Sequence, residues 1–228
     1  MARPAKEKSE PILFVLPEMR LVNGHLFVKS AFKNEETGVE GTPRYRVEMS
    51  TPEDDAEFNK VIDNVCAEVI KKHGDNAFVS VVEDPFKGGL EVRGPFILGD
   101  KLAKKREAKG KNNNDGYKGM WVIRADTDFN WEGLNALGGI AVYDEEVEKI
   151  TPLDAGKVYN GCYGCAKVEL SFYTDNDGDP ACKFYLKAFQ KTRDGERFAA
   201  AQDHSADFKP VGRQQSEDGG STRRSRRG

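Results

Sequence analysis

Apolar and polar residues alternate along several short stretches of the chain, and one longer stretch repeats its apolar residues every three to four positions. Alternation with a period of two is typical of a β-strand with one buried face, whereas the longer period is typical of an amphipathic helix. The alternating stretches are residues 20–29, 44–49, 117–125, 139–143, 162–174 and 181–191. The pattern therefore predicts a mainly β protein with one packed helix.

The helical stretch covers about residues 52–73. Its apolar positions are Phe58, Val61, Ile62, Val65, Val69 and Ile70. Thr51 can cap the helix, Pro52 suits its first position, and Gly74 can end it. A single apolar stripe indicates that the helix packs against a sheet.

A long basic insertion separates this helix from the next predicted strand. Residues 85–117 contain two prolines and several glycines, and KLAKKREAKGK at 101–111 has six basic residues against Glu107. We expect a long basic loop over about 85–117, with a short helix over 100–109.

The order of these elements predicts the domain organisation. We expect a flexible N-terminal arm over 1–17, one domain over 18–200, and a disordered tail over 201–228 with an Arg-rich end. Five or six strands around one amphipathic helix favour a variant OB-fold, which is a partly open antiparallel β-barrel, over a parallel sheet.

Composition narrows the class of protein. The chain has 228 residues, of which 38% are hydrophobic and 32% charged, with 13 Phe and 7 Tyr, so one modest core is expected. The apolar run at 12–16 is too short for a membrane span or a signal peptide, which favours a reducing cytoplasm. The net charge of −3 does not indicate a nucleic-acid partner, so only a local basic surface could bind one.

The stretch at 182–191 contains the most informative candidate site. If it is a strand, one face holds Lys183, Tyr185, Lys187, Phe189 and Lys191. Exposed rings interleaved with lysines suit single-stranded nucleic acid, because bases stack on rings while lysines contact phosphates. The alternative is a half-buried barrel strand whose lysines extend past its rings.

Other stretches supply further candidate DNA contacts. They are Tyr163 and Lys167 on the preceding strand, Arg44, Tyr45 and Arg46, Tyr117, Lys118, Trp121 and Arg124, and Lys104, Lys105 and Arg106 in the basic insertion. A structural explanation stays open for each group: an edge strand protected by charges, a core tryptophan, or a solvated surface.

The sequence contains only weak patterns for a metal-binding site or a catalytic site. Cys162 and Cys165 lack a second pair at zinc-binding spacing, and the aspartates at 175–179 suit a hairpin turn better than a calcium loop. We expect no metal, no cofactor and no enzymatic activity. The alternatives are a metal-dependent nuclease using Asp126, Asp128 and Glu132, or a module that binds a partner other than nucleic acid.

Four segments in this order carry a resemblance to a known family: RLVNGHLF at 20–27, GYKGMWVIRA at 116–125, VYNGCYGCAKVELSFY at 158–173 and FYLKAFQKTRDGERF at 184–198. The chain resembles the OB-fold single-stranded DNA-binding proteins of lytic tailed phages, including a group first catalogued as a domain of unknown function.

The resemblance implies a variant OB barrel that coats and protects single-stranded DNA (ssDNA) during phage replication and recombination. It implies little sequence specificity and location in the cytoplasm of the infected bacterial host. Expected partners are ssDNA, phage replication proteins and a second copy in a homodimer, with no membrane. Better-known relatives have an acidic C-terminal tail, whereas this chain ends in RRSRRG, which suits additional phosphate contacts.

Overall fold

The computed structural model describes residues 10–31, 38–81, 88–111, 114, 116–128 and 140–198. The predicted tail at 201–228 lies outside the described residues. No helix within the described ranges is long and apolar enough to cross a membrane.

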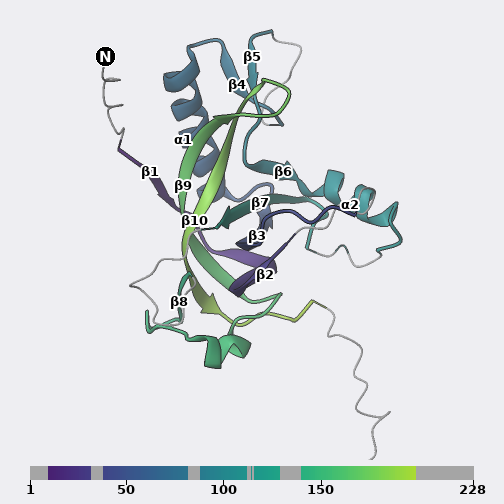
Figure 1. The fold of residues 1–228 in the computed structure, drawn as a ribbon, viewed down its shortest axis with the longest axis vertical. Helices are drawn as coiled ribbons and strands as arrows, with labels where there is room; N and C mark the ends of the chain where they lie inside the picture. The colour runs from purple at the N-terminus through teal and green to yellow at the C-terminus, as the bar shows by residue number, and fades with distance from the viewer. Residues whose placement is uncertain are drawn as a thin grey trace, which may run out of the picture. The chain divides into compact units, whose positions relative to one another are not determined.

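Strands dominate the described chain, which confirms the predicted mainly β class (Figure 1). The helices are α1 (Ala56–His73), α2 (Gly99–Glu107) and the short 3₁₀ helix η2 (Pro152–Lys157). The strands are β1 (Ile12–Val15), β2 (Met19–Ser30), β3 (Arg44–Pro52), β4 (Ala77–Val79), β5 (Leu90–Val92), β6 (Phe96–Leu98), β7 (Met120–Thr127), β8 (Ala141–Tyr143), β9 (Tyr163–Thr174) and β10 (Pro180–Arg193).

The main sheet curves into a partly open OB-type barrel. Its strand order is β1-β9-β2-β3-β7-β10-β8, and an additional β9–β10 pairing brings its two sides together. Only two residue pairs join β2 to β9, and two join β7 to β10, so the sheet is not continuously closed. The predicted OB-type fold is confirmed as an open sheet and not a closed barrel, and the sheet is not wholly antiparallel, because β10 pairs in parallel with both β7 and β8.

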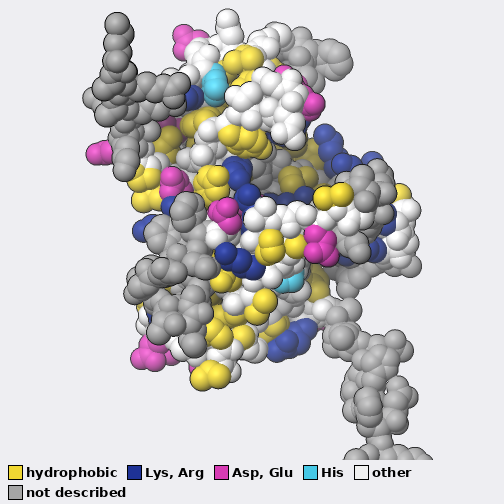
Figure 2. Space-filling view, in the orientation of Figure 1, with side chains coloured by type: hydrophobic (Ala, Val, Ile, Leu, Met, Phe, Trp, Pro, Cys, Tyr) yellow, Lys and Arg dark blue, Asp and Glu magenta, His cyan; other side chains and the backbone are white. Residues whose placement is uncertain are grey.

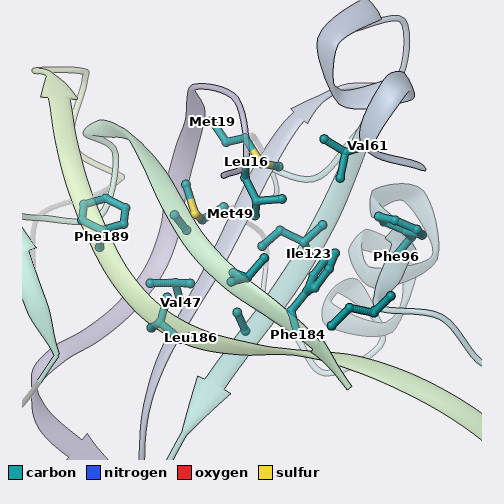
Figure 3. Packing of buried hydrophobic residues seen from close by; sticks show 14 of the residues in the cluster. Leu16, Met19, Val47, Met49, Val61, Phe96, Ile123, Phe184, Leu186 and Phe189 are labelled. Atoms are coloured by element: carbon teal, nitrogen blue, oxygen red, sulfur yellow. The ribbon is translucent and has the colours of Figure 1, made fainter. Parts of the chain in front are cut away.

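Alternate residues of the barrel strands and one face of α1 form the core. Figure 3 shows Met49, Ile123 and Phe184 among its buried side chains, with Val61 of α1 beside them. Phe96 of β6 meets Phe184 edge-on, with ring centroids 6.0 Å apart. The helix is therefore fixed on the barrel by its apolar stripe, as the 3.6-residue period predicts.

The start of α1 differs from the prediction by four residues. Pro52 belongs to β3, and the N-cap is Asp55, whose Oδ1 accepts the backbone N–H groups of Glu57 and Phe58 at 3.0 Å. The Thr51 hydroxyl donates to the Asp55 carboxylate at 2.7 Å, so Thr51 supports the cap instead of forming it.

Two segments that were predicted as a flexible arm and a long loop contain strands. Residues 12–15, assigned to the arm, form β1 and pair with β9. The described part of the predicted loop at 85–117 contains β5, β6 and α2, and α2 confirms the helix expected over 100–109. A small second core of Val22, Ala103, Tyr117 and Val122 holds α2 against the sheet.

Candidate nucleic-acid interface

The strand register places five outward side chains on one line across the barrel. Glu169 of β9 lies opposite Tyr185 of β10, Tyr185 beside Asp126 of β7, Asp126 opposite Arg46 of β3, and Arg46 opposite His25 of β2. Cations and a second tyrosine flank this line. We call the combined surface the cationic face, defined by Arg44, Arg46, Arg124, Tyr173, Lys183, Tyr185 and Lys187.

Two tyrosine rings and one ammonium form the middle of the cationic face. The Lys183 Nζ lies 4.2 Å from the centroid of the Tyr185 ring and 5.9 Å from that of Tyr173. Tyr173 is 42% exposed, and Tyr185 is partly exposed. Figure 2 shows Lys and Arg side chains gathered beside the β9–β10 hairpin. On β10, Lys183 and Tyr185 therefore lie on one face, as the alternation of cations and rings predicts.

One carboxylate links two cations of the face. Asp126 Oδ1 lies 2.7 Å from Arg44 Nη1 and 3.9 Å from Lys183 Nζ. The hydrogen bond to Asp126 is the main reason that the pKa of Arg44 is raised. Both cations are partly buried, so they are held in place before any ligand arrives.

Two of the remaining cations of the face are also paired with carboxylates. Lys187 pairs with Glu169, and Arg124 pairs with Glu48, which also accepts the Tyr117 hydroxyl at 2.6 Å. Burial, the Glu48 charge and this hydrogen bond raise the pKa of Tyr117. A phosphate that binds Arg44, Lys187 or Arg124 would therefore compete with a carboxylate that is already paired with that cation.

His25 adds no positive charge to the line at neutral pH. Partial burial and the nearby Arg46 guanidinium both lower its pKa. The Arg46 guanidinium donates to the carbonyl of Ser30, which fixes the side chain along β2.

The predicted row on β10 is interrupted at its centre. A register shift between Leu186 and Ala188 inserts Lys187 as an extra residue, so the alternation reverses after it. Phe189 is 0% exposed, and Lys191 is only 9% exposed, with its Nζ 2.7 Å from Asp194 Oδ1. The expectation that Phe189 and Lys191 lie on the exposed face is therefore wrong.

Three further aromatic candidates are not exposed platforms. Tyr45 and Tyr117 are buried, and Trp121 packs edge-on against Phe96. Arg106 lies 4.7 Å above the Tyr117 ring, and Lys118 pairs with Glu107. Lys104 and Lys105 are exposed on α2, beside β6 and β7.

The metal and catalytic alternatives gain no geometric support. Within the described ranges, no group of three or more His, Cys, Asp or Glu side chains could hold a metal ion. Cys162 is buried, Cys165 faces outward, and burial raises the pKa of both thiols. Asp175 shapes the hairpin turn by accepting the backbone N–H groups of Asp177 and Asp179. Glu132 lies outside the described residues.

Sequence reasoning missed several exposed rings and cations. Tyr173 follows the same alternation as Tyr163 and Lys167 along β9, which is the pattern that could have found it. Tyr159, Arg193 and Arg197 come together at the other end of the β9–β10 hairpin, and they belong to segments without alternation.

An OB-type barrel with a cationic, tyrosine-bearing face is the architecture of an OB-fold nucleic-acid-binding protein. The chain matches, over residues 14–219, the family described as "Enterobacter phage Enc34, ssDNA-binding protein". It therefore belongs to this family of phage single-stranded DNA-binding proteins, which confirms the resemblance of its four segments. Comparison with curated proteins gives no significant match.

Solved structures support the fold. The single-stranded DNA-binding protein from bacteriophage Enc34 in complex with ssDNA is similar with a TM-score of 0.57 at 20% identity, covering 86% of this chain and 97% of that chain. The structure of the same phage protein described without DNA is similar with a TM-score of 0.54 at 20% identity, covering 90% of this chain and 96% of that chain.

Proposed function

We propose that this protein coats ssDNA through the cationic face during phage DNA replication and recombination. Bases stack on Tyr185 and Tyr173, while phosphates bind Lys183, Arg44 and Arg46. The observation that carries the proposal is the ammonium of Lys183 close to two tyrosine rings, the exposed Tyr173 and the partly exposed Tyr185, beside the line of outward side chains that crosses the barrel. The family to which the chain belongs supports the same function.

The chemistry of the face favours single strands over duplex. A ring can stack on a base only when that base is not already covered by its neighbours. Stacking accepts every base, so sequence preference is slight. Since no part of this interaction breaks a bond, the protein acts without catalysis, in the cytoplasm of the infected host.

The proposal is tested with fluorescence anisotropy of labelled oligo(dT), without divalent metal. Tyr185→Ala removes one stacking surface and is expected to weaken binding by about 1–3 kcal/mol, or about 5- to 150-fold. Tyr143→Ala, which truncates a partly buried tyrosine of β8, is the matched control and should bind like the parent. A parent protein that does not bind oligo(dT), or a Tyr185→Ala variant that binds as tightly, would overturn the proposal.

The absence of catalysis has its own test. Asp126, the central acid of the alternative nuclease site, is engaged by Arg44. Labelled DNA incubated with the protein and magnesium or manganese should stay intact. Cleavage that disappears in an Asp126→Asn variant would establish the nuclease instead.

A further inference from the structure

Three guanidinium groups lie on three aromatic rings at the open end of the β9–β10 hairpin. The distances from the guanidinium carbon to the ring centroid are 3.4 Å for Arg193 on Tyr163, 3.8 Å for Arg197 on Tyr159, and 3.9 Å for Arg20 on Phe198. We call these six residues the arginine–aromatic cluster. The cationic face does not include any of them.

The backbone around the cluster is closely packed. A Cβ at Gly195 would lie 2.2 Å from the carbonyl oxygen of Gly161, and a Cβ at Gly161 would lie 2.1 Å from that of Glu196. The two segments can therefore approach only because both positions are glycine. This approach brings Arg197 over Tyr159.

Polar contacts hold the side chains of the cluster in position. The Arg193 Nε donates to Glu18 at 2.8 Å, and the Tyr159 hydroxyl donates to Asp194 at 2.8 Å. The Arg20 guanidinium donates to the carbonyl of Glu196 at 2.8 Å. The Arg193 and Arg20 guanidinium groups and the Tyr159 ring are thus oriented before a ligand binds, which lowers the entropic cost of binding.

Two of the three guanidinium groups, those of Arg193 and Arg197, are accessible to solvent. The side chain of Arg193 is 54% exposed, and Arg197 is also exposed. Each of these two guanidinium groups contacts a ring on one side and keeps part of its surface open to solvent. Unstacked bases stack on arginine planes as they do on aromatic rings.

The outer side of β9 connects the cluster to the cationic face. Tyr163, Cys165, Lys167 and Glu169 alternate outward along this strand, and Lys167 is exposed midway. Tyr163 and Glu169 are six residues apart, a span of about 20 Å at the rise of a β-strand. An extended strand of nucleic acid can follow this line with a phosphate at Lys167.

We propose that the arginine–aromatic cluster is a second binding site for nucleobases of the same ssDNA, with Arg193 and Arg197 as its stacking planes. The bound strand runs along the outer side of β9 from the cationic face to the cluster. This inference rests on the proposed function and extends the length of DNA that one molecule covers.

The test replaces the planar cations by non-planar ones. Arg193→Lys/Arg197→Lys keeps both charges and removes both guanidinium planes. We expect an affinity for oligo(dT) at least about fivefold lower and a smaller occluded site size, with an unchanged slope of log K against log salt. Arg93→Lys is the matched control, because Arg93 is also exposed and forms an ion pair with Asp175. It should bind like the parent.

Photo-crosslinking provides a readout that does not depend on the variants. Oligo(dT) containing 4-thiothymidine should crosslink to peptides that contain Arg193 or Arg197 in the parent protein. Unchanged affinity and site size in the double variant, or the absence of these crosslinks while Tyr185→Ala still weakens binding, would overturn the inference alone. A parent protein without affinity for ssDNA would instead overturn the proposed function.

Discussion

Asp126 is the residue that holds the cationic face in its DNA-free arrangement. Its carboxylate contacts Arg44 directly and lies within ion-pair distance of Lys183. In the proposed complex, a phosphate on either cation competes with this carboxylate, so we expect Asp126 to reduce the net affinity for DNA.

Asp126→Asn is therefore expected to tighten ssDNA binding. Loss of a competing, partly exposed ion pair corresponds to about 0.2–1 kcal/mol, which is an increase in affinity of about 1.4- to 5-fold. Anisotropy with oligo(dT) measures the change, and Asp63→Asn on the exposed side of α1 is the control. Weaker binding by Asp126→Asn would show that the carboxylate supports the DNA-binding arrangement instead.

Phe189 lies in the core, although it is on the same strand as the proposed DNA contact Tyr185. Because its ring is fully buried, Phe189→Ala should lower the free energy of unfolding by about 3–5 kcal/mol. The affinity of the folded fraction for ssDNA should not change. Urea unfolding and anisotropy distinguish the two effects, and a stable Phe189→Ala protein that fails to bind DNA would contradict this assignment.

Alternation alone could predict Lys183, Tyr185 and Lys187 but not the residues after them. The bulge at Lys187 reverses the two faces of β10, and the local sequence Leu186 to Phe189 contains no glycine that would mark it. Similarly, Tyr45 follows a strand pattern correctly, but only the packed structure shows that its ring points into the core.

At the scale of the element, the start of α1 depends on one side chain. Asp55→Ala removes the acceptor for two backbone N–H groups and should lower the free energy of unfolding by about 0.5–2 kcal/mol. Glu53→Ala, at an exposed neighbouring position, is the control in urea unfolding. Equal stability of Asp55→Ala and the parent would show that another group caps the helix.

The contribution of Asp55 should depend on pH. Partial burial, which would raise the pKa of Asp55, is outweighed by hydrogen bonds from Thr51, Phe58 and Glu57, so the pKa lies below the ordinary value of 3.8. The stabilising effect is therefore fully present above about pH 4 and is lost as the pH falls through the folded pKa. The difference between the parent and Asp55→Ala should shrink in the same direction.

The long elements were predictable from the sequence, whereas three of the four three-residue strands were not. The apolar period of α1 and the alternation of β9 extend over enough residues to be distinctive. In contrast, β4, β5 and β6 contain three residues each, too few for a period to appear. Two strands that the sequence did not predict, β5 and β6, therefore lie within the predicted loop at 85–117.

At the scale of the whole molecule, the net charge is a poor guide to DNA binding. The chain carries 35 basic and 38 acidic side chains, yet the cationic face places five cations within one surface. The order of the strands around the barrel depends on pairings between distant segments, such as the parallel β7–β10 contact. Local patterns contain no information about such pairings.

Salt dependence should report how many phosphates the whole surface binds. Each phosphate contact on a single strand contributes about −0.7 to the slope of log K against log salt, so five contacts give about −3.5. Anisotropy across a sodium chloride series measures this slope, with a matching duplex as the comparison. A slope near zero for oligo(dT) would contradict electrostatic binding, and equal affinity for duplex would direct attention to truncation of the chain at Arg213.

The pairing of the cations of the face with the protein's own carboxylates also affects how a bound strand leaves. In the proposed complex, when one phosphate moves away from Arg44 or Lys183, Asp126 is close enough to pair with the cation again, so the charge is not left without a partner. We therefore expect release to proceed by successive exchanges of phosphate for carboxylate. A coat built this way can hold DNA firmly as a whole and still yield it, nucleotide by nucleotide, to an advancing enzyme.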